Sequence, residues 1–255
     1  MPPATTRSTD DTQLRKSRPT QVAEAIKSWV MEQGLQSGDR LPGEAEMIER
    51  FGMSKGTIRE ATRILEAQGL VRTRTGPGGG TFLHEMSADR ARALLSNYFY
   101  FRDLSLDDIY QIRAALEPEV AASLAGKLSV DQLEQLRAVM TSYTEPAKTA
   151  DEEREQHVAS LEFHALLAGM SDNPLLAFVI GFVARTLCDV TLYRRLYDPP
   201  NHELWVRGKQ YQQELLQALQ SGDAEKARQT MAAHMDTARQ LMQQQQAEVL
   251  RRFIP

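Results

Sequence analysis

Cationic and hydroxyl side chains gather at the start of one segment, FGMSKGTIREATRILEAQGL at residues 51–70. Ser54 can cap a helix there, because its hydroxyl can accept a hydrogen bond from an amide of the first turn that is otherwise unpaired. Lys55, Thr57 and Arg59 then lie opposite a row of aliphatic residues at helical spacing. Such side chains can pair with guanine edges, phosphates or thymine methyl groups. The pattern is typical of a helix that enters the DNA major groove, and the alternative is an ordinary amphipathic helix with a solvated basic side.

The segments around this helix predict a winged helix. A helix is expected from Pro19 to Gly34, and a short second helix carries Met47, Ile48 and Phe51 on its apolar side. After the recognition helix, residues 70–74 and 81–83 are β-prone runs around a Gly-Pro-Gly-Gly-Gly tip, which indicates a small hairpin. The glycines are not followed by Gly-Lys-Ser/Thr or by a helix start, so they do not indicate a nucleotide loop.

The rest of the chain has helical periodicity throughout. Short breaks separate the expected helices, which makes an antiparallel bundle of about seven helices and a mainly α protein. Residues 1–18 are expected to form a disordered arm, residues 19–86 the winged helix, and residues 87–255 the bundle. The expected bundle helices are 88–102, 105–126, 129–143, 150–170, 174–197, 202–220 and 223–250.

Composition narrows the class of protein. The net charge is −4, with about +1 on residues 1–86 and −5 on residues 87–255, so composition permits DNA binding without arguing for it. Cys188 is the only cysteine, which excludes a secreted disulfide scaffold. The N-terminus lacks an apolar signal region, and no apolar run is expected to reach the length of a membrane span. These features indicate a soluble cytoplasmic protein.

Residues 20–84 resemble a known family. The order "GDRLP.E", "FG.S..T.REA...LE..GLV" and a glycine-rich wing is similar to the DNA-binding domain of bacterial GntR transcription regulators, over about residues 20–84. The resemblance implies DNA contacts from Ser54, Lys55, Thr57, Arg59 and Gly76. Two positions depart from the family pattern, because Ala45 and Lys55 stand where arginine is usual, and lysine lacks the planar fork of arginine.

The second part resembles the FCD ligand-binding domain of FadR-like GntR regulators, through "IRAALEPEVAASLA", "FHALLAGMSDNPLL" and "LLQALQSGDAEKARQTMAAHM". In many such domains one Asp and three His bind a divalent metal. The register of the resemblance places these ligands at Ser160, His164, Gln212 and His234. Serine and glutamine replace two of the four ligands, and neither is a good ligand for a transition metal.

Two hypotheses follow for this site. His164 and His234, with help from His157, could still hold zinc, nickel or manganese. The alternative, which we favour, is an organic effector held directly by Ser160, His164, Gln212 and His234. The resemblance implies that Arg113 pairs with an effector carboxylate, a task that suits a bidentate arginine. Arg185 is a second candidate, although an ion pair with Asp189 four residues later would equally explain it.

Catalytic patterns are weak. Glu162 would point away from Ser160 and His164 on a helix, so these residues do not indicate a catalytic triad, and Cys188 has the character of a core thiol. We therefore expect a homodimeric, ligand-responsive transcription regulator, not an enzyme, that binds an inverted-repeat operator and an anionic, organic-acid effector. The alternatives are a metal-dependent helical enzyme with an attached winged helix, and a winged-helix scaffold for protein contacts.

Overall fold

The computed structural model describes residues 17–99, 101–102 and 104–253. Its contacts divide the chain into two compact units, Met1–Ala91 and Arg92–Pro255. Most of the expected disordered arm lies outside the described residues. Within that arm, Arg18 is instead the first residue of a helix, and the Ser17 side chain caps it by accepting a hydrogen bond from the Thr20 amide.

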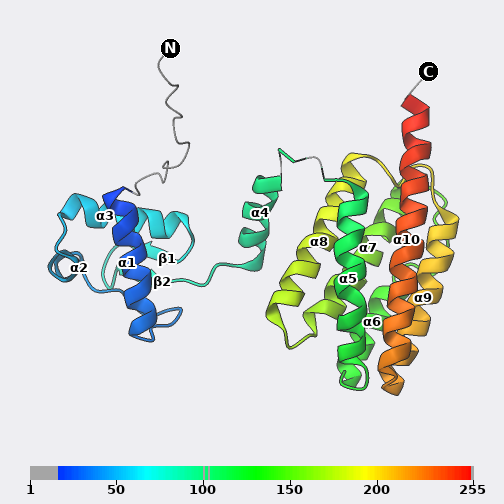
Figure 1. The fold of residues 1–255 in the computed structure, drawn as a ribbon, viewed down its shortest axis with the longest axis horizontal. Helices are drawn as coiled ribbons and strands as arrows, with labels where there is room; N and C mark the ends of the chain where they lie inside the picture. The colour runs from blue at the N-terminus through cyan, green and yellow to red at the C-terminus, as the bar shows by residue number, and fades with distance from the viewer. Residues whose placement is uncertain (1–16, 100, 103, 254–255) are drawn as a thin grey trace, which may run out of the picture. The chain divides into compact units, whose positions relative to one another are not determined.

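The first unit has the predicted winged-helix fold of three helices and a hairpin (Figure 1). Antiparallel pairing of the two strands places Val71 opposite Leu83 and Arg74 opposite Gly80. Their apolar side chains join the inner faces of the helices in one core around Ile26, Ile58 and Leu65. The elements are α1 (Arg18–Glu32), α2 (Glu44–Phe51), α3 (Lys55–Ala67), β1 (Val71–Arg74) and β2 (Gly80–Leu83).

The second unit is the predicted all-helical bundle (Figure 1). Helix α10 packs along α5 and α9, while α7 packs against α8 and α6. Two apolar clusters fill the interior, one around Phe163 and Leu215 and the other around Leu187 and Met242. The helices are α4 (Ala88–Phe99, which contains the division between the units), α5 (Leu106–Leu124), α6 (Val130–Thr141), α7 (Ala150–Gly169), α8 (Pro174–Tyr193), α9 (His202–Ser221) and α10 (Ala224–Phe253).

Local sequence signals explain where several helices begin. The predicted capping box at α5 is present, because Ser105 Oγ accepts from the Asp108 amide and the Asp108 carboxylate accepts from the Ser105 amide. Ser129 and Gln132 form the same reciprocal pair at α6. Each box satisfies two amides that the helix itself leaves unpaired, which fixes the first turn.

Helix α8 corrects one sequence expectation. By length and composition it could cross a membrane, with a mean hydropathy of 1.9 over an 18-residue window, although no such run was expected. The expectation was wrong because Gly181 does not interrupt the helix and Arg185 is tolerated within it. In the bundle, α8 packs against α7 and α5 and contributes Ile180, Ala184 and Leu187 to the core. Helix α8 therefore contributes one side to the core, while only 33% of its apolar window is buried within the chain.

Candidate functional site

The exposed side of α3 displays the predicted cations. Ile58, Ala61 and Leu65 are buried, whereas the side chains of Lys55 and Arg59 are each 63% exposed. The buried and the exposed residues lie on opposite sides of α3 because the aliphatic residues recur at helical spacing. The structure therefore leaves the first turns of α3 open on their polar side.

The predicted hydroxyl residues of α3 belong to its N-terminal cap. Ser54 Oγ accepts a hydrogen bond from the Thr57 amide at 3.3 Å and lies 2.9 Å from Thr57 Oγ1. Gly76 stands in the exposed loop between β1 and β2 with a φ of 90°, a conformation that favours glycine. Because glycine has no side chain, the backbone at Gly76 can approach a binding partner closely.

A residue that sequence analysis missed stands beside these cations. Glu44, in the first turn of α2, accepts a hydrogen bond from Arg59 Nε to Oε2 at 2.7 Å, and its Oε1 lies 3.1 Å from Lys55 Nζ. The pKa of the Glu44 carboxyl is held below its ordinary value. The largest cause is its hydrogen bond with Lys55, and Arg59 adds to it. Lys55 and Arg59 are one turn apart on α3, but no helical spacing links Glu44 to them, so only the turn between α2 and α3 brings Glu44 close.

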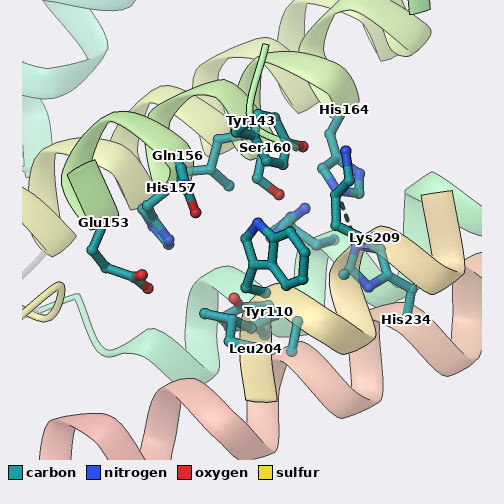
Figure 2. A pocket seen from close by; sticks show the side chains of 15 residues that line it. Tyr110, Tyr143, Glu153, Gln156, His157, Ser160, His164, Leu204, Lys209 and His234 are labelled. Carbon is teal, nitrogen blue, oxygen red and sulfur yellow. Dashed lines mark hydrogen bonds between the residues drawn. The ribbon is translucent and has the colours of Figure 1, made fainter. Parts of the chain in front are cut away.

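The second candidate site is a cavity of about 50 Å³ within the bundle. Figure 2 shows Glu153, His157, Ser160 and His164 directed into it from α7, with His234 across from His164. The volume corresponds to a few water molecules or a small ligand group. The lining residues are Tyr110, Arg113, Tyr143, Glu153, Gln156, His157, Ser160, Leu161, His164, Leu204, Trp205, Gly208, Lys209, His234 and Ala238.

Four of the six predicted effector residues line this cavity, namely Arg113, Ser160, His164 and His234. Gln212 is buried next to it, where its Oε1 accepts a hydrogen bond from the Tyr143 hydroxyl at 2.9 Å. Tyr143 is a lining residue and Gln212 is not, so Gln212 contacts the cavity lining without belonging to it.

The sixth predicted effector residue, Arg185, does not reach the cavity. Its side chain is 73% exposed, and its Nε lies 3.7 Å from Asp189 Oδ1. The ion-pair explanation is therefore the correct one for Arg185. The effector assignment failed because α8 turns this position outward while its neighbours Ala184 and Leu187 face the core.

Arg113, His164 and His234, which line the cavity, are joined through the buried Glu117 in a series of polar contacts. Arg113 Nε donates to Glu117 Oε1 at 2.6 Å, and Glu117 Oε2 lies 2.6 Å from His164 Nδ1. His164 Nε2 is in turn 3.2 Å from His234 Nε2, with the two rings stacked. Glu117 was not singled out from the sequence, although its spacing of four residues from Arg113 is a signal for a helical ion pair.

Burial and charge set the protonation of these groups. Burial alone would raise the pKa of Glu117, but the charges and hydrogen bonds of Arg113 and His164 together outweigh it and hold that pKa well below its ordinary value. Burial lowers the pKa of His164 and of His234, and it lowers that of His157 to about 4. At neutral pH the three histidines are therefore uncharged, and Glu117 neutralises Arg113.

Several buried donors around the cavity are unpaired. Arg113 Nη2, Trp205 Nε1 and Gln212 Nε2 have no hydrogen-bond partner among the described residues, and neither has His157 Nε2. Each unpaired buried group costs about 1–3 kcal/mol. Unpaired donors of this kind can pair with acceptor atoms of a ligand, and Gln156 Oε1, also in the wall, is an unpaired acceptor. Sequence analysis had no signal for Trp205, because an apolar residue at helical spacing normally indicates core packing.

The side chains present do not fit the divalent metal that related domains hold. No group of three or more His, Cys, Asp or Glu side chains with suitable geometry occurs within the described ranges. Ser160 and Gln212 offer neutral oxygens in place of a carboxylate and an imidazole, and the Gln212 oxygen already accepts from Tyr143. Zinc sites need imidazole, thiolate or carboxylate donors, usually three or four of them.

Comparison with known proteins agrees with the two-part architecture. Residues 19–83 match the gntR family of bacterial regulatory proteins, and residues 108–237 match the FCD domain. An Uxu operon regulator of Haemophilus influenzae is 25% identical over 225 residues, which cover 86% of this chain and 80% of the relative. A protein of Escherichia coli, named as a regulator of the L-lactate dehydrogenase operon, is 26% identical over 227 residues, 84% of this chain and 82% of the relative.

A solved structure shares the fold. Streptococcus agalactiae GntR superposes with a TM-score of 0.60 at 21% identity, over 87% of this chain and 99% of that one. The winged helix with its open cationic face, the FCD bundle and these matches lead to one assignment: the chain belongs to the gntR family of bacterial transcription regulators, in the FadR-like group that joins a DNA-binding winged helix to an FCD domain.

Proposed function

We propose that this regulator recognises its operator through the N-terminal half of α3 and the wing tip, and that a small organic acid bound in the bundle controls operator affinity. Membership in a family of DNA-binding transcription regulators sets the enzyme alternative aside. The operator contacts are assigned to Ser54, Lys55, Thr57, Arg59 and Gly76. The open cationic side of α3 supports this assignment, since it offers donors for guanine edges and phosphates.

Substitution of Arg59 tests the operator assignment. Arg59→Ala is expected to weaken operator binding by about 1–3 kcal/mol, and the fall of affinity with rising salt should become shallower if a phosphate contact is lost. Arg185→Ala is the matched control, because it removes an exposed cation from the bundle. Fluorescence anisotropy with labelled operator measures both. Equal affinities for the two variants would refute the role of α3.

The active form is proposed to be a homodimer on an inverted repeat. Two recognition helices must reach half-sites one helical turn apart, which a two-fold symmetric pair achieves. The bundle has surface for the contact, because only 33% of the apolar window of α8 is buried within the chain and Leu175 is largely exposed. Sedimentation velocity should give a dimer at micromolar concentration, and a monomer with and without operator would contradict it.

The effector class follows from the unpaired donors. Arg113 Nη2 and Trp205 Nε1 both belong to the cavity wall, and Lys209 adds a cation beside them. A carboxylate brings several acceptor lone pairs, so it would pair these donors and recover the free energy that they now cost. A relative named for the L-lactate dehydrogenase operon is consistent with this size and charge, since lactate is a small carboxylate. The metal-binding alternative is disfavoured by the donor set.

A thermal-shift screen tests the effector class. Each small carboxylic acid is compared with its own amide, such as lactate with lactamide, so that the two ligands differ in charge and in one acceptor oxygen replaced by a donor NH2 group. Acids should raise the melting temperature and change operator affinity, whereas their amides should not. Binding shifts operator affinity only as far as the acid prefers one of the two states.

Variants of the wall complete the test. Arg113→Lys keeps a cation beside Glu117 but loses the guanidinium fork, and it should weaken acid binding roughly ten- to a hundredfold, since a hydrogen bond to a charged group is worth about 1.5–3 kcal/mol. Arg185→Ala should bind as the wild type does. An unchanged response in Arg113→Lys would refute the site. Stoichiometric zinc, nickel or manganese in the purified protein, with a response that a chelator abolishes, would refute the metal-free version.

A further inference from the structure

Glu44 connects α2 to both cations of the recognition helix. One carboxylate oxygen accepts from Arg59 Nε at 2.7 Å, and the other lies 3.1 Å from Lys55 Nζ. The three side chains are 36% to 63% exposed. Exposed ion pairs of this kind contribute little to folding stability, because solvent screens them. The bridge is therefore better explained by what it does to the two cations than by what it does to the fold.

The position of the carboxylate also has a cost for DNA binding. A negative charge beside the cations of α3 opposes their attraction to phosphates, and attraction to phosphates supplies most of the affinity for DNA of any sequence. The pKa of Glu44 is lowered by its two partners, so the charge is present at neutral pH. A group that weakens sequence-independent attraction while it orients the groups that contact bases would raise specificity.

We propose that Glu44 is a positioning residue for operator recognition, an inference that rests on the proposed role of α3. The carboxylate holds Arg59 through Nε, which leaves the terminal guanidinium nitrogens to form a bidentate pair with a guanine edge. A pre-ordered arginine loses less side-chain entropy on binding than a free one. Lys55 is held by the other oxygen, so one acidic side chain sets the direction of both cations.

Helix α2 provides a matched control. Glu46 lies two residues further along and forms an exposed pair with Arg50 at 3.2 Å, a contact within α2. Glu44→Gln and Glu46→Gln each remove one negative charge from the same helix, so their effects on net charge and long-range attraction are alike. Only Glu44→Gln releases Lys55 and Arg59.

The experiment measures the ratio of affinities for operator and for a scrambled duplex of equal length, with the full chain. Glu44→Gln should bind the scrambled duplex severalfold more tightly and the operator about tenfold more weakly, so that the ratio falls by more than tenfold. Glu46→Gln should leave the ratio within about twofold of the wild type. A merely structural role for Glu44 would lower the melting temperature of the winged helix and weaken both duplexes together, which would overturn the proposal.

The double variant separates this inference from the proposed operator contacts. Because Glu44 acts through both Arg59 and Lys55, Glu44→Gln should lower the ratio less in an Arg59→Ala background than in the wild type, and no further when Lys55→Ala is added. A ratio that responds to Arg59→Ala but not to Glu44→Gln overturns the role of Glu44 and leaves the α3 assignment intact. A ratio that responds to neither variant overturns both. If Glu44→Gln raised the affinity for both duplexes equally, Glu44 would act only by repelling the phosphates, and the proposal would also be overturned.

Discussion

The buried carboxylate Glu117 offers a sharp test of the cavity electrostatics. Its side chain and that of Arg113 are both only 3% exposed, and its second oxygen contacts His164. Glu117→Gln keeps the shape of the side chain but removes its charge. The Arg113 guanidinium would then stand in the protein interior without an opposite charge.

The expected cost follows from that burial. Breaking a buried ion pair by removing one partner typically destabilises a protein by about 3–5 kcal/mol, because the remaining charge has lost both water and its partner. Glu117→Gln should therefore lower the unfolding free energy of the bundle by roughly this amount. Replacing both partners, as in Arg113→Met with Glu117→Gln, should restore much of the stability, since no buried charge remains.

Urea denaturation at pH 7.5 measures these differences. The chain has two tryptophans, Trp29 in the first unit and Trp205 in the bundle, so a Trp29→Phe background makes fluorescence report the bundle alone. Glu119→Gln is the matched control, because Glu119 lies on the same helix but forms an exposed pair with Arg228. The expected change for Glu119→Gln is small. A Glu117→Gln variant no less stable than Glu119→Gln would refute the argument for a buried, charge-dependent pair.

Two further predictions concern pH and capping. Burial lowers the pKa of His157 to about 4, whereas the pKa of an unfolded histidine is about 6.5. The unfolded chain therefore binds a proton at a higher pH than the folded chain does. The free energy of unfolding should fall by about 3 kcal/mol in all as the pH drops from about 6.5 toward 4. The stability of His157→Phe should therefore depend less on pH in this window, and parallel curves for the two proteins would contradict the assignment. Ser105→Ala removes the hydroxyl of the α5 capping box and should cost about 0.5–2 kcal/mol. Ser123→Ala, whose hydroxyl bonds only to the Val120 carbonyl of its own helix, is the control, and urea midpoints of the two variants should differ accordingly.

The parts of the fold that follow from the sequence are those decided within a few residues. Ser54, Ser105 and Ser129 cap the helices that they were expected to start, because capping involves a side chain and an amide three residues later. The hairpin likewise follows from two β-prone runs around a glycine-rich tip. Membrane-span length in α8 was missed, since a single glycine need not end an apolar helix.

The cavity contains contacts that short-range sequence patterns did not predict. Register placed Ser160, His164 and His234 together, as the structure has them. The helical register gave no information on Tyr143, which lies 69 positions before Gln212 and whose hydroxyl donates a hydrogen bond to Gln212 Oε1. Glu44 was missed for the same reason, because its contacts with Lys55 and Arg59 depend on how α2 packs against α3.

Two arginines with the same sequence signal illustrate the physical limit. Arg113 and Arg185 each have a carboxylate four residues later, and each forms the helical ion pair that this spacing allows. Arg113 and Glu117 face the interior of the bundle, so their pair is nearly dry, and Nη2 of the guanidinium is unpaired. Arg185 and Asp189 face outward, so water screens the pair and satisfies the unused donors. Spacing fixes which side chains can meet, whereas the packing of other helices decides whether water is present. An arginine and a carboxylate at the same spacing therefore form a buried pair with an unpaired donor at one position and a solvated surface pair at the other.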